Sequence, residues 1–139
     1  MKKALVLMLL LMVTSVAFGQ GGCRGPIKNL RAAILNIFNQ QYPGVTAQWY
    51  RCSGGGRVIR RATFKTGNVE TEVSYDKAGK VFQIRKQMSA TDLPADAITY
   101  LEKNYKGKLT NAMQVTDAKG NIIYYAGGYK FDSNGKVIK

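Results

Sequence analysis

The chain has 139 residues and is strongly basic, with 21 Lys and Arg residues, 8 Asp and Glu residues and a formal net charge of +13 at pH 7. It contains no histidine, so the commonest general base and the commonest transition-metal ligand are missing. The carboxylates are dispersed, and the sequence has no nucleic-acid-binding motif. The composition therefore argues against an enzyme, a metal or cofactor protein, and a nucleic-acid-binding protein.

Residues 1–19 have the three parts of a secretory signal peptide. A basic start is followed by the apolar run 4–18 and by a small-x-small cleavage site that ends at Gly19. We expect cleavage after Gly19, a periplasmic or secreted protein, and no transmembrane segment in the mature chain. Two alternatives stay open. One is a retained anchor, although the run is shorter than the roughly 20 residues of a spanning helix. The other is a lipid on Cys23, although Gln20 stands where lipid attachment requires an apolar residue.

The only two cysteines, Cys23 and Cys52, follow this export signal. An even number of cysteines in an oxidising compartment favours a disulfide, which would tie the N-terminus to the first strand after the first helix. A metal site is an alternative, but it would lack histidine and further cysteine ligands. A reactive thiol is another, but no base is visible to activate it. The disulfide is the favoured interpretation.

The first half of the mature chain predicts one helix followed by four strands. Apolar residues recur at helical spacing over about 26–41, from a proline that suits a helix start to the stop signal Tyr42-Pro43-Gly44. Beyond that point apolar and polar residues alternate, which indicates an antiparallel sheet with one covered face. The expected strands are 45–52, 57–65, 69–75 and 80–87.

The second half repeats this order in a shorter form. A helix is expected over 93–104, with Asp92 as its cap and Pro94 in its first turn. The pair Gly127-Gly128 stands between the last two expected strands, either as a hairpin turn or as a bulge within one long strand. The expected strands of this half are 109–116, 121–126 and 129–132.

A ten-residue segment occurs twice and relates the two halves. Residues 73–82 match residues 129–138 at an offset of 56, and each copy places an Asp-x-x-Gly turn before a Lys-Val strand start. The helices align at an offset of 63, so the second half is seven residues shorter between helix and hairpin. We therefore expect residues 20–139 to form a single α+β domain. It would be a tandem repeat, about 26–87 and 92–139, of one helix plus an antiparallel β-meander. The helices would pack on one face of the sheet and leave the other face open.

Several short motifs occur in a defined order along the mature chain: Tyr42-Pro43, Trp49, Ala62-Thr63-Phe64, Val73-Ser74-Tyr75-Asp76-x-x-Gly79, Leu93-Pro94-x-x-x-Ile98 and Tyr129-Lys130-Phe131-Asp132-x-x-Gly135. In this order they resemble the PepSY-like family of proposed periplasmic proteins, whose tandem repeats are similar to the β-lactamase-inhibitor protein fold. The resemblance covers essentially the whole mature chain and departs from the duplicated pattern in the shortened second half. It implies this fold, export, and a binding rather than a catalytic character.

Aromatic and arginine side chains on the expected strands are the candidates for partner binding. Alternation along 57–61 puts Arg57 and Arg61 on one face and Arg60 on the other. The adjacent aromatic pairs Trp49-Tyr50 and Tyr124-Tyr125 also place one ring on each face of the sheet. At least one ring of each pair is therefore expected to avoid the helices. Alternatively, Trp49 and one tyrosine of each pair belong to the core. The candidates are Trp49, Tyr50, Arg57, Arg60, Arg61, Tyr124 and Tyr125.

The sequence favours an exported binding module that uses the open sheet face against a protein partner, as an inhibitor or a regulator. The positive charge raises encounter rates with anionic partners such as acidic proteins or phosphorylated lipid headgroups. An envelope-associated protein held to anionic surfaces by charge alone is the alternative from a different class. A small-molecule pocket between sheet and helices is a third possibility. No cofactor is expected.

Overall fold

The computed structural model describes residues 22–54 and 56–139. The expected signal peptide, residues 1–19, lies outside the described residues. Among the residues that are described, no helix is long and apolar enough to cross a membrane.

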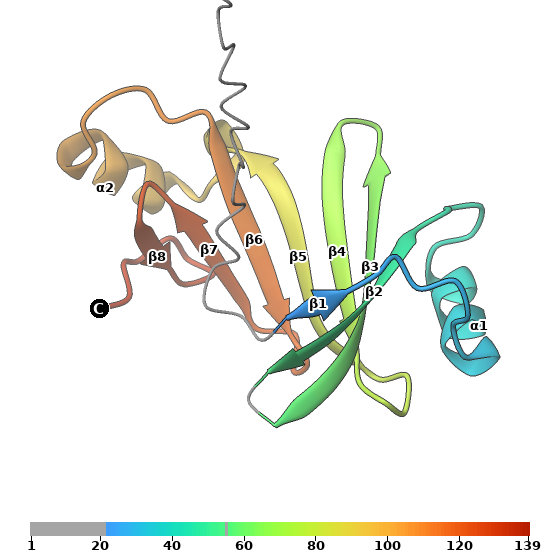
Figure 1. Cartoon of the computed structure of the whole chain (residues 1–139). Coiled ribbons are helices and arrows are strands. Elements are labelled where there is room, and N and C mark those ends of the chain that lie inside the picture. Colours follow the sequence, from blue (N-terminus) through green and yellow to red (C-terminus); the bar gives the residue numbers. More distant parts are fainter. Residues whose placement is uncertain (1–21, 55) are drawn as a thin grey trace, which may run out of the picture.

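A single antiparallel sheet of eight described strands forms most of the structure, with the strands in sequence order (Figure 1). The helices α1 (Ala32–Gln41) and α2 (Ala95–Asn104) lie near opposite ends of this sheet, and the short 3₁₀ helix η1 (Ala90–Asp92) precedes α2. The expected α+β class is confirmed. The strands are β1 (Cys23–Arg24), β2 (Gln48–Gly54), β3 (Arg57–Thr66), β4 (Val69–Tyr75), β5 (Val81–Ser89), β6 (Asn111–Asp117), β7 (Ile122–Ala126) and β8 (Tyr129–Phe131).

The first hydrophobic core lies between α1 and strands β2 to β4. The ring of Phe38 meets the rings of Trp49 and Phe64 edge-on, at centroid distances of 5.2 and 5.5 Å. Tyr75 is fully buried in the same cluster, and its hydroxyl donates a 2.7 Å hydrogen bond to Gln41 Oε1. The buried members of this core are Ile34, Phe38, Trp49, Ala62, Phe64, Val73 and Tyr75.

A second core lies between α2 and strands β6 to β8. It is built from smaller side chains around the fully buried ring of Phe131, and Tyr100 packs edge-on against that ring at 5.7 Å. The buried members are Ala90, Leu93, Ala97, Leu101, Ala112, Ala126 and Phe131. Seven cross-strand residue pairs between β5 and β6, from Gln83 with Asp117 to Ser89 with Asn111, join the two parts of the sheet.

The start of the first helix differs from the expectation. Helical spacing suggested a start at residue 26, but α1 begins at Ala32. The Ile27 backbone N–H donates a 2.7 Å hydrogen bond to the Trp49 carbonyl, so the chain before the helix runs along β2. This tertiary pairing outweighs the local helical pattern, because an amide that bonds to a neighbouring strand is not available to a helical turn.

The second helix also begins later than expected. Asp92 was expected to cap it, but Asp92 ends η1, and α2 begins three residues further on at Ala95. The Pro94 carbonyl accepts hydrogen bonds from the N–H groups of Ala97 and Ile98, so Pro94 precedes the helix as its first backbone acceptor. The expected ends of both helices, residues 41 and 104, are confirmed.

The Asp-x-x-Gly turn occurs three times, once more than the duplicated segment suggested. The third copy, Asp117 to Gly120, connects β6 and β7. It falls between the strands expected at 109–116 and 121–126 and was not expected as a copy of the other two. In every copy one aspartate Oδ1 accepts hydrogen bonds from two backbone N–H groups, at 2.8 or 2.9 Å. These bonds join Asp76 to Ala78 and Lys80, Asp117 to Lys119 and Asn121, and Asp132 to Asn134 and Lys136.

The pair Gly127-Gly128 forms a two-residue hairpin turn, because the flanking residues Ala126 and Tyr129 are cross-strand partners. The alternative of a bulge within one long strand is therefore wrong. Beyond β8 the described chain makes one isolated bridge, between Phe131 and Val137. The second half thus contributes three strands to the sheet, against four strands between the two helices.

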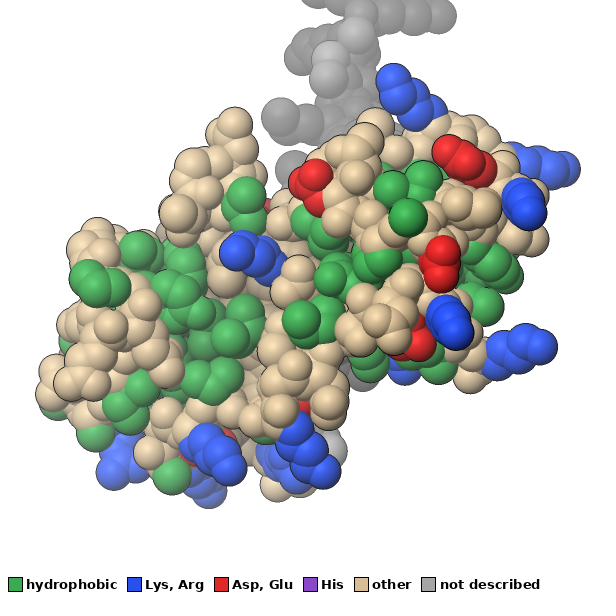
Figure 2. Space-filling model, turned by 180° about the vertical axis from the view of Figure 1, so that it is seen from behind, with side chains coloured by type: hydrophobic (Ala, Val, Ile, Leu, Met, Phe, Trp, Pro, Cys, Tyr) green, Lys and Arg blue, Asp and Glu red, His purple; other side chains and the backbone are tan. Residues whose placement is uncertain are grey.

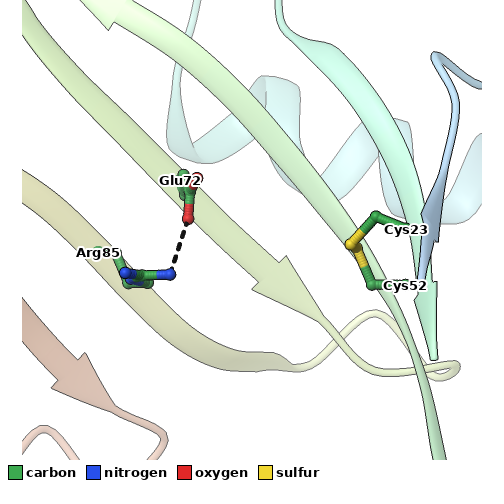
Figure 3. The surroundings of a disulfide bond; sticks show 4 residues. All are labelled: Cys23, Cys52, Glu72 and Arg85. Carbon is green, nitrogen blue, oxygen red and sulfur yellow. Dashed lines mark ion pairs between the residues drawn. A yellow bond between two sulfur atoms is a disulfide. The ribbon is translucent and has the colours of Figure 1, made fainter. Parts of the chain in front are cut away.

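The expected disulfide between Cys23 and Cys52 is confirmed (Figure 3). The two residues are direct cross-strand partners, and their Cα atoms lie 4.0 Å apart. Cys52 is buried, whereas Cys23 is exposed on β1. The two-residue strand β1 was not expected from the sequence, because it is too short to show an alternating pattern.

Candidate binding surface

The sheet has a face that points away from the core beneath α1. Residues paired across neighbouring strands point to the same side of a sheet, and the next residue along each strand points to the other side. Trp49, Ala62 and Val73 form one such row in the core. The rows on the opposite side make up what we call the open face, and its residues include Tyr50, Arg61, Ser74, Gln83, Asp117, Thr63, Glu72, Arg85, Val115, Ile123, Met113 and Tyr125.

A hollow of about 420 Å³ lies on the open face. Its walls come from strands β3, β5, β6 and β7, so it spans the junction between the two parts of the sheet. It is lined by Arg61, Gln83, Arg85, Met113, Val115 and Tyr125. Arginine, tyrosine and methionine are enriched in protein interfaces, which makes this lining typical of a contact surface.

Arg85 lies at the centre of the polar contacts in this hollow. Its Nε and one terminal nitrogen both point at the Met113 sulfur, at 3.3 and 3.2 Å. Its other terminal nitrogen lies 3.5 Å from Glu72 Oε2 on the neighbouring strand (Figure 3). Glu72 Oε2 accepts no hydrogen bond from the described residues, so this contact is an ion pair without hydrogen-bond geometry. Both side chains are about one-third exposed, and such a pair contributes little to stability.

The neighbours Arg60 and Arg61 point to opposite faces of the sheet. Arg61 pairs with Tyr50 and Ser74 on the open face, whereas Arg60 pairs with Tyr75 on the face of the first core. The Arg61 Nε is buried and has no hydrogen-bond partner among the described residues. Arg60 Nη1 is likewise buried without a partner among the described residues, but of the two arginines only Arg61 lines the hollow.

Tyr125 forms one wall of the hollow and is 42% exposed, more than any other large hydrophobic or aromatic side chain in the described core strands. The ammonium group of Lys130, its cross-strand partner, lies over the ring at 5.9 Å from the centroid. At this distance a cation–π contact holds a positive charge at the rim of the hollow.

The structure separates the expected partner-binding residues into two groups. Tyr50, Arg61 and Tyr125 lie on the open face, and Arg57 lies on the same side at the end of β3, with its guanidinium 5.1 Å from the centre of the Phe82 ring. Trp49 is 7% exposed and belongs to the first core, as the alternative interpretation held. Tyr124 packs against the second core, and Arg60 shares that side of the sheet.

Sequence reasoning missed four residues of the hollow: Gln83, Arg85, Met113 and Val115. A signal was present for Arg85, since it follows the inward-pointing Ile84 on a predicted strand and must point outward. No sequence signal could place Met113 beside it. That contact depends on the register between β5 and β6, which are separated by α2 along the chain.

None of the groups with clearly shifted pKa values lines the hollow. Burial raises the pKa values of Tyr42 and Tyr75, and both tyrosines pack in or against the first core. The side-chain hydrogen bond from Asn121 lowers the pKa of Asp117, whose carboxylate organises the turn between β6 and β7. Among the described residues no group of three or more His, Cys, Asp or Glu side chains is placed to hold a metal.

A second hollow, of about 450 Å³, lies beside α2. Its lining is mainly apolar and includes Ile98, Leu101, Tyr105 and Leu109. Unlike the open-face hollow, it brings together no two side chains of the same charge and no arginine. It is the place where the small-molecule interpretation would apply, and its polar side-chain groups are those of Thr91, Glu102 and Lys108 and the hydroxyl of Tyr105.

The chain matches no known family model and no curated protein. It is similar in structure to a proposed periplasmic protein from Bacteroides eggerthii, with a TM-score of 0.64 and 14% identity over 80% of this chain and 87% of that one. A DUF2874 family protein from Bacteroides uniformis has a TM-score of 0.64 and 15% identity over 80% and 88%. A BLIP-like protein from Bacteroides fragilis has a TM-score of 0.59 and 17% identity over 81% and 86%. At these identities the likeness concerns the fold, and the chain has the α+β fold of these Bacteroides proteins.

Proposed function

We propose that this protein is an exported, non-catalytic binding module that inhibits or regulates a protein partner in the periplasm through the open face of its sheet. The observation that carries the proposal is the open-face hollow, where two arginines, a tyrosine and a methionine meet on the side of the sheet that points away from the first core. Arginine and tyrosine supply much of the binding energy in protein interfaces, and methionine is enriched in them. The BLIP-like description of one structural neighbour is consistent with an inhibitory role.

Three observations support export to the periplasm. The sequence begins with a segment that has the composition of a signal peptide. The Cys23–Cys52 disulfide persists in oxidising compartments such as the periplasm. One neighbour of the same fold is described as a proposed periplasmic protein. Cleavage near Gly19 follows from the sequence pattern and is part of the same proposal.

We also propose that the domain is a tandem repeat with both helices on one face of the sheet, as in the PepSY-like pattern. Equivalent contacts support this. A Cβ atom on Gly79 would lie 2.7 Å from Ile37 and 3.8 Å from Ile34 of α1, and one on Gly135 would lie 2.8 Å from the Ala97 nitrogen of α2. Ile34 and Ala97 are 63 residues apart, and the two glycines are 56 apart, which are the helix and hairpin offsets of the sequence.

The strand pairs account for the seven missing residues. Val73 follows its partner Ala62 by 11 residues, whereas Tyr129 follows its partner Ala126 by 3, which is eight residues fewer. Arg61 follows Tyr50 by 11 residues and Tyr125 follows Met113 by 12, which is one residue more. The net difference is seven residues when the long β3–β4 hairpin is matched with the short β7–β8 hairpin. The pairing also supports a common helix face, because the row through Val73 continues to Ile84 and Thr116 on the side that carries Ala112.

Attachment to anionic surfaces by charge alone is the second candidate function. It is favoured by the positive charge, which is +13 for the full chain and 19 − 8 = +11 once Lys2 and Lys3 are removed with residues 1–19. The Lys and Arg side chains visible in Figure 2 stand mainly around the margin of the molecule and do not gather in one patch. A dispersed charge supports weak, salt-sensitive attraction to a membrane surface but not the definite docking of one partner.

Arg60 and Arg61 lie on opposite faces of the sheet, and substitutions at these two positions test the open-face proposal. Each of Arg60→Glu and Arg61→Glu changes the net charge by the same amount, but only Arg61 lines the hollow. We expect the exported protein to capture a defined partner from periplasmic extract, identified by mass spectrometry. Arg61→Glu should reduce that capture at least tenfold, because a rim or pocket charge of the wrong sign opposes docking. Arg60→Glu should leave it nearly unchanged.

The same two variants separate the alternatives. Equal losses in both variants, together with sedimentation on anionic vesicles that disappears at high salt, would favour attachment by charge alone. Unchanged capture by Arg61→Glu would overturn the open-face proposal. Thermal unfolding followed by circular dichroism should show that both variants keep the fold, so that a loss of capture reflects the surface.

A further inference from the structure

We propose that the open-face hollow is a carboxylate site, in which Arg85 and Arg61 together hold one Asp or Glu side chain of the protein partner. The inference rests on the proposed function and names the chemistry that the open face recognises. Three features of the hollow carry it: the orientation of the Arg85 guanidinium, the local balance of charge, and the apolar walls around the two arginines.

The Arg85 guanidinium presents a two-donor edge to a weak acceptor. Its Nε and one terminal nitrogen both point at a single atom, the Met113 sulfur, at 3.3 and 3.2 Å. This edge is one of the two edges of a guanidinium that match the two oxygens of a carboxylate. A thioether sulfur accepts hydrogen bonds only weakly, and a methionine side chain is flexible. A carboxylate that displaces the sulfur would exchange two weak hydrogen bonds for two charge-assisted ones.

The charge around the hollow is only partly balanced. Its lining includes the two guanidinium groups of Arg61 and Arg85, and Lys130 adds a cation over the Tyr125 rim. Glu72 is the one carboxylate in contact with Arg85 among the described residues, at 3.5 Å and without a hydrogen bond. The buried Arg61 Nε also has no partner among them. One additional negative charge would therefore be attracted by these three cations. It would be opposed by Glu72 and by Asp117, the cross-strand partner of Gln83, whose carboxylate already accepts two backbone hydrogen bonds in its own turn.

The walls of the hollow favour a side chain of a protein over a small free anion. Met113, Val115 and Tyr125 surround the arginines with apolar and aromatic surface, which can cover the methylene groups of Asp or Glu and the residues next to it. The volume of about 420 Å³ is larger than a lone carboxylate requires. A lipid phosphate is a poorer match, since the hollow lies within the sheet face and not at a projecting tip.

Peptide selection tests the carboxylate site and does not require that the partner be identified first. A random twelve-residue peptide library displayed on phage is selected against the exported protein, and the recovered sequences are compared with those from Arg85→Gln and from Arg60→Gln. We expect enrichment of Asp or Glu on the native chain and on Arg60→Gln, and loss of that enrichment on Arg85→Gln. Binding of a recovered peptide should weaken about tenfold or more when its acidic residue is changed to the amide, as for charged hydrogen bonds.

The ion pair offers a matched pair of variants with opposite predicted effects. Arg85→Gln removes the proposed carboxylate donor, so recovered peptides should bind about tenfold more weakly or worse. Glu72→Gln removes the competing anion and leaves Arg85 in place, so the same peptides should bind several-fold more tightly. A purely structural role of the Arg85–Glu72 pair would weaken binding in both variants.

Met113 reports directly on the displacement. The ε-methyl groups of methionine are labelled with ¹³C, and the Met113 signal is assigned with Met113→Leu. Met88 serves as the internal control, since it packs against the second core and not in the hollow. A recovered acidic peptide should shift the Met113 signal and leave the Met88 signal in place, and its amide counterpart should shift neither.

The other possible results of these experiments each overturn a stated proposal. Recovered peptides without acidic enrichment that still require Arg61 would overturn the carboxylate site and leave the open-face function standing. Failure to enrich any sequence, or enrichment that ignores both arginines, would overturn the inference and count against the proposed function as well. Displacement of the peptides by vesicles of phosphatidylglycerol at high salt would assign the site to lipid phosphate and overturn the protein carboxylate.

Discussion

Gly79 and Gly135 each close an Asp-x-x-Gly turn beneath a helix, with φ angles of 85° and 86°. A side chain in this left-handed region is strained, and each glycine also lies against its helix too closely for a Cβ atom. The obstacles differ in kind. At Gly79 the nearest atom is the terminal Cδ1 of Ile37, whereas at Gly135 it is a backbone nitrogen, that of Ala97, with the Pro94 ring at the same distance of 2.8 Å.

We expect Gly135→Ala to be the more destabilising of the two substitutions. Both variants should lose about 1–2 kcal/mol from the left-handed conformation. Gly135→Ala should lose a further 1–3 kcal/mol, roughly the cost of overpacking, because the backbone of α2 would have to move. At Gly79 the end of the Ile37 side chain can turn away. Urea unfolding of the two variants measures the difference, and equal losses would contradict the contact at Ala97.

At the scale of the element, the disulfide is a covalent constraint on the N-terminal part of the described chain. It joins residues 29 apart in the sequence and holds the two-residue strand β1 against β2. Replacement of both cysteines by alanine should lower the free energy of unfolding by about 3–4 kcal/mol in the chain-entropy model. Denaturant unfolding with and without a reducing agent measures this. The reductant should shift the midpoint of the native chain and leave the double variant unchanged, and a native midpoint that does not respond would contradict the prediction.

The elements also show how far the sequence could lead. Alternation and turn residues predicted β2 to β8 and the ends of both helices, because those signals are local. They did not predict where the helices start. The start of α1 depends on the hydrogen bond from the Ile27 N–H to the Trp49 carbonyl, and the start of α2 on the hydrogen bonds that the Pro94 carbonyl accepts. They also did not predict β1, whose two residues carry no pattern.

The binding surface was predictable only in part for the same reason. Alternation placed Arg61 and Arg60 on opposite faces, and the register bears this out. The contact between Arg85 and Met113, by contrast, joins residues 28 apart across α2. A contact of that kind depends on which strands become neighbours, and local spacing does not contain that information.

At the scale of the whole molecule, two cores share one sheet. The first is rich in aromatic rings and the second is built largely from alanine and leucine around Phe131. The seven residue pairs between β5 and β6 connect them through the middle of the sheet. Because β5 and β6 are paired along their length, unfolding of one core would remove hydrogen-bonded partners from the strands of the other. We therefore expect both cores to unfold together in one cooperative transition.

Leu101→Ala tests this coupling. It removes a buried side chain of the second core and should cost about 2–5 kcal/mol. The only tryptophan, Trp49, lies in the first core and reports on that part by its fluorescence. We expect the Trp49 unfolding midpoint to fall together with the midpoint seen by circular dichroism. A Trp49 transition that stays at its native midpoint would show that the two cores unfold independently.

The two outermost described strands determine whether another chain can add a strand to the edges of the sheet. A long bare sheet margin can recruit a strand from another chain, and proteins avoid this with very short or charged edge strands. Here one margin is the two-residue β1, which carries Arg24 and is held by the disulfide, and the other is the three-residue β8, which carries Lys130. Among the described residues neither of these short strands presents a long ladder of free backbone groups, and the outer side of β8 is already bridged at Phe131 by Val137. Strand addition and side-by-side self-association are therefore disfavoured. A binding partner is expected to contact a face of the sheet and not its edge.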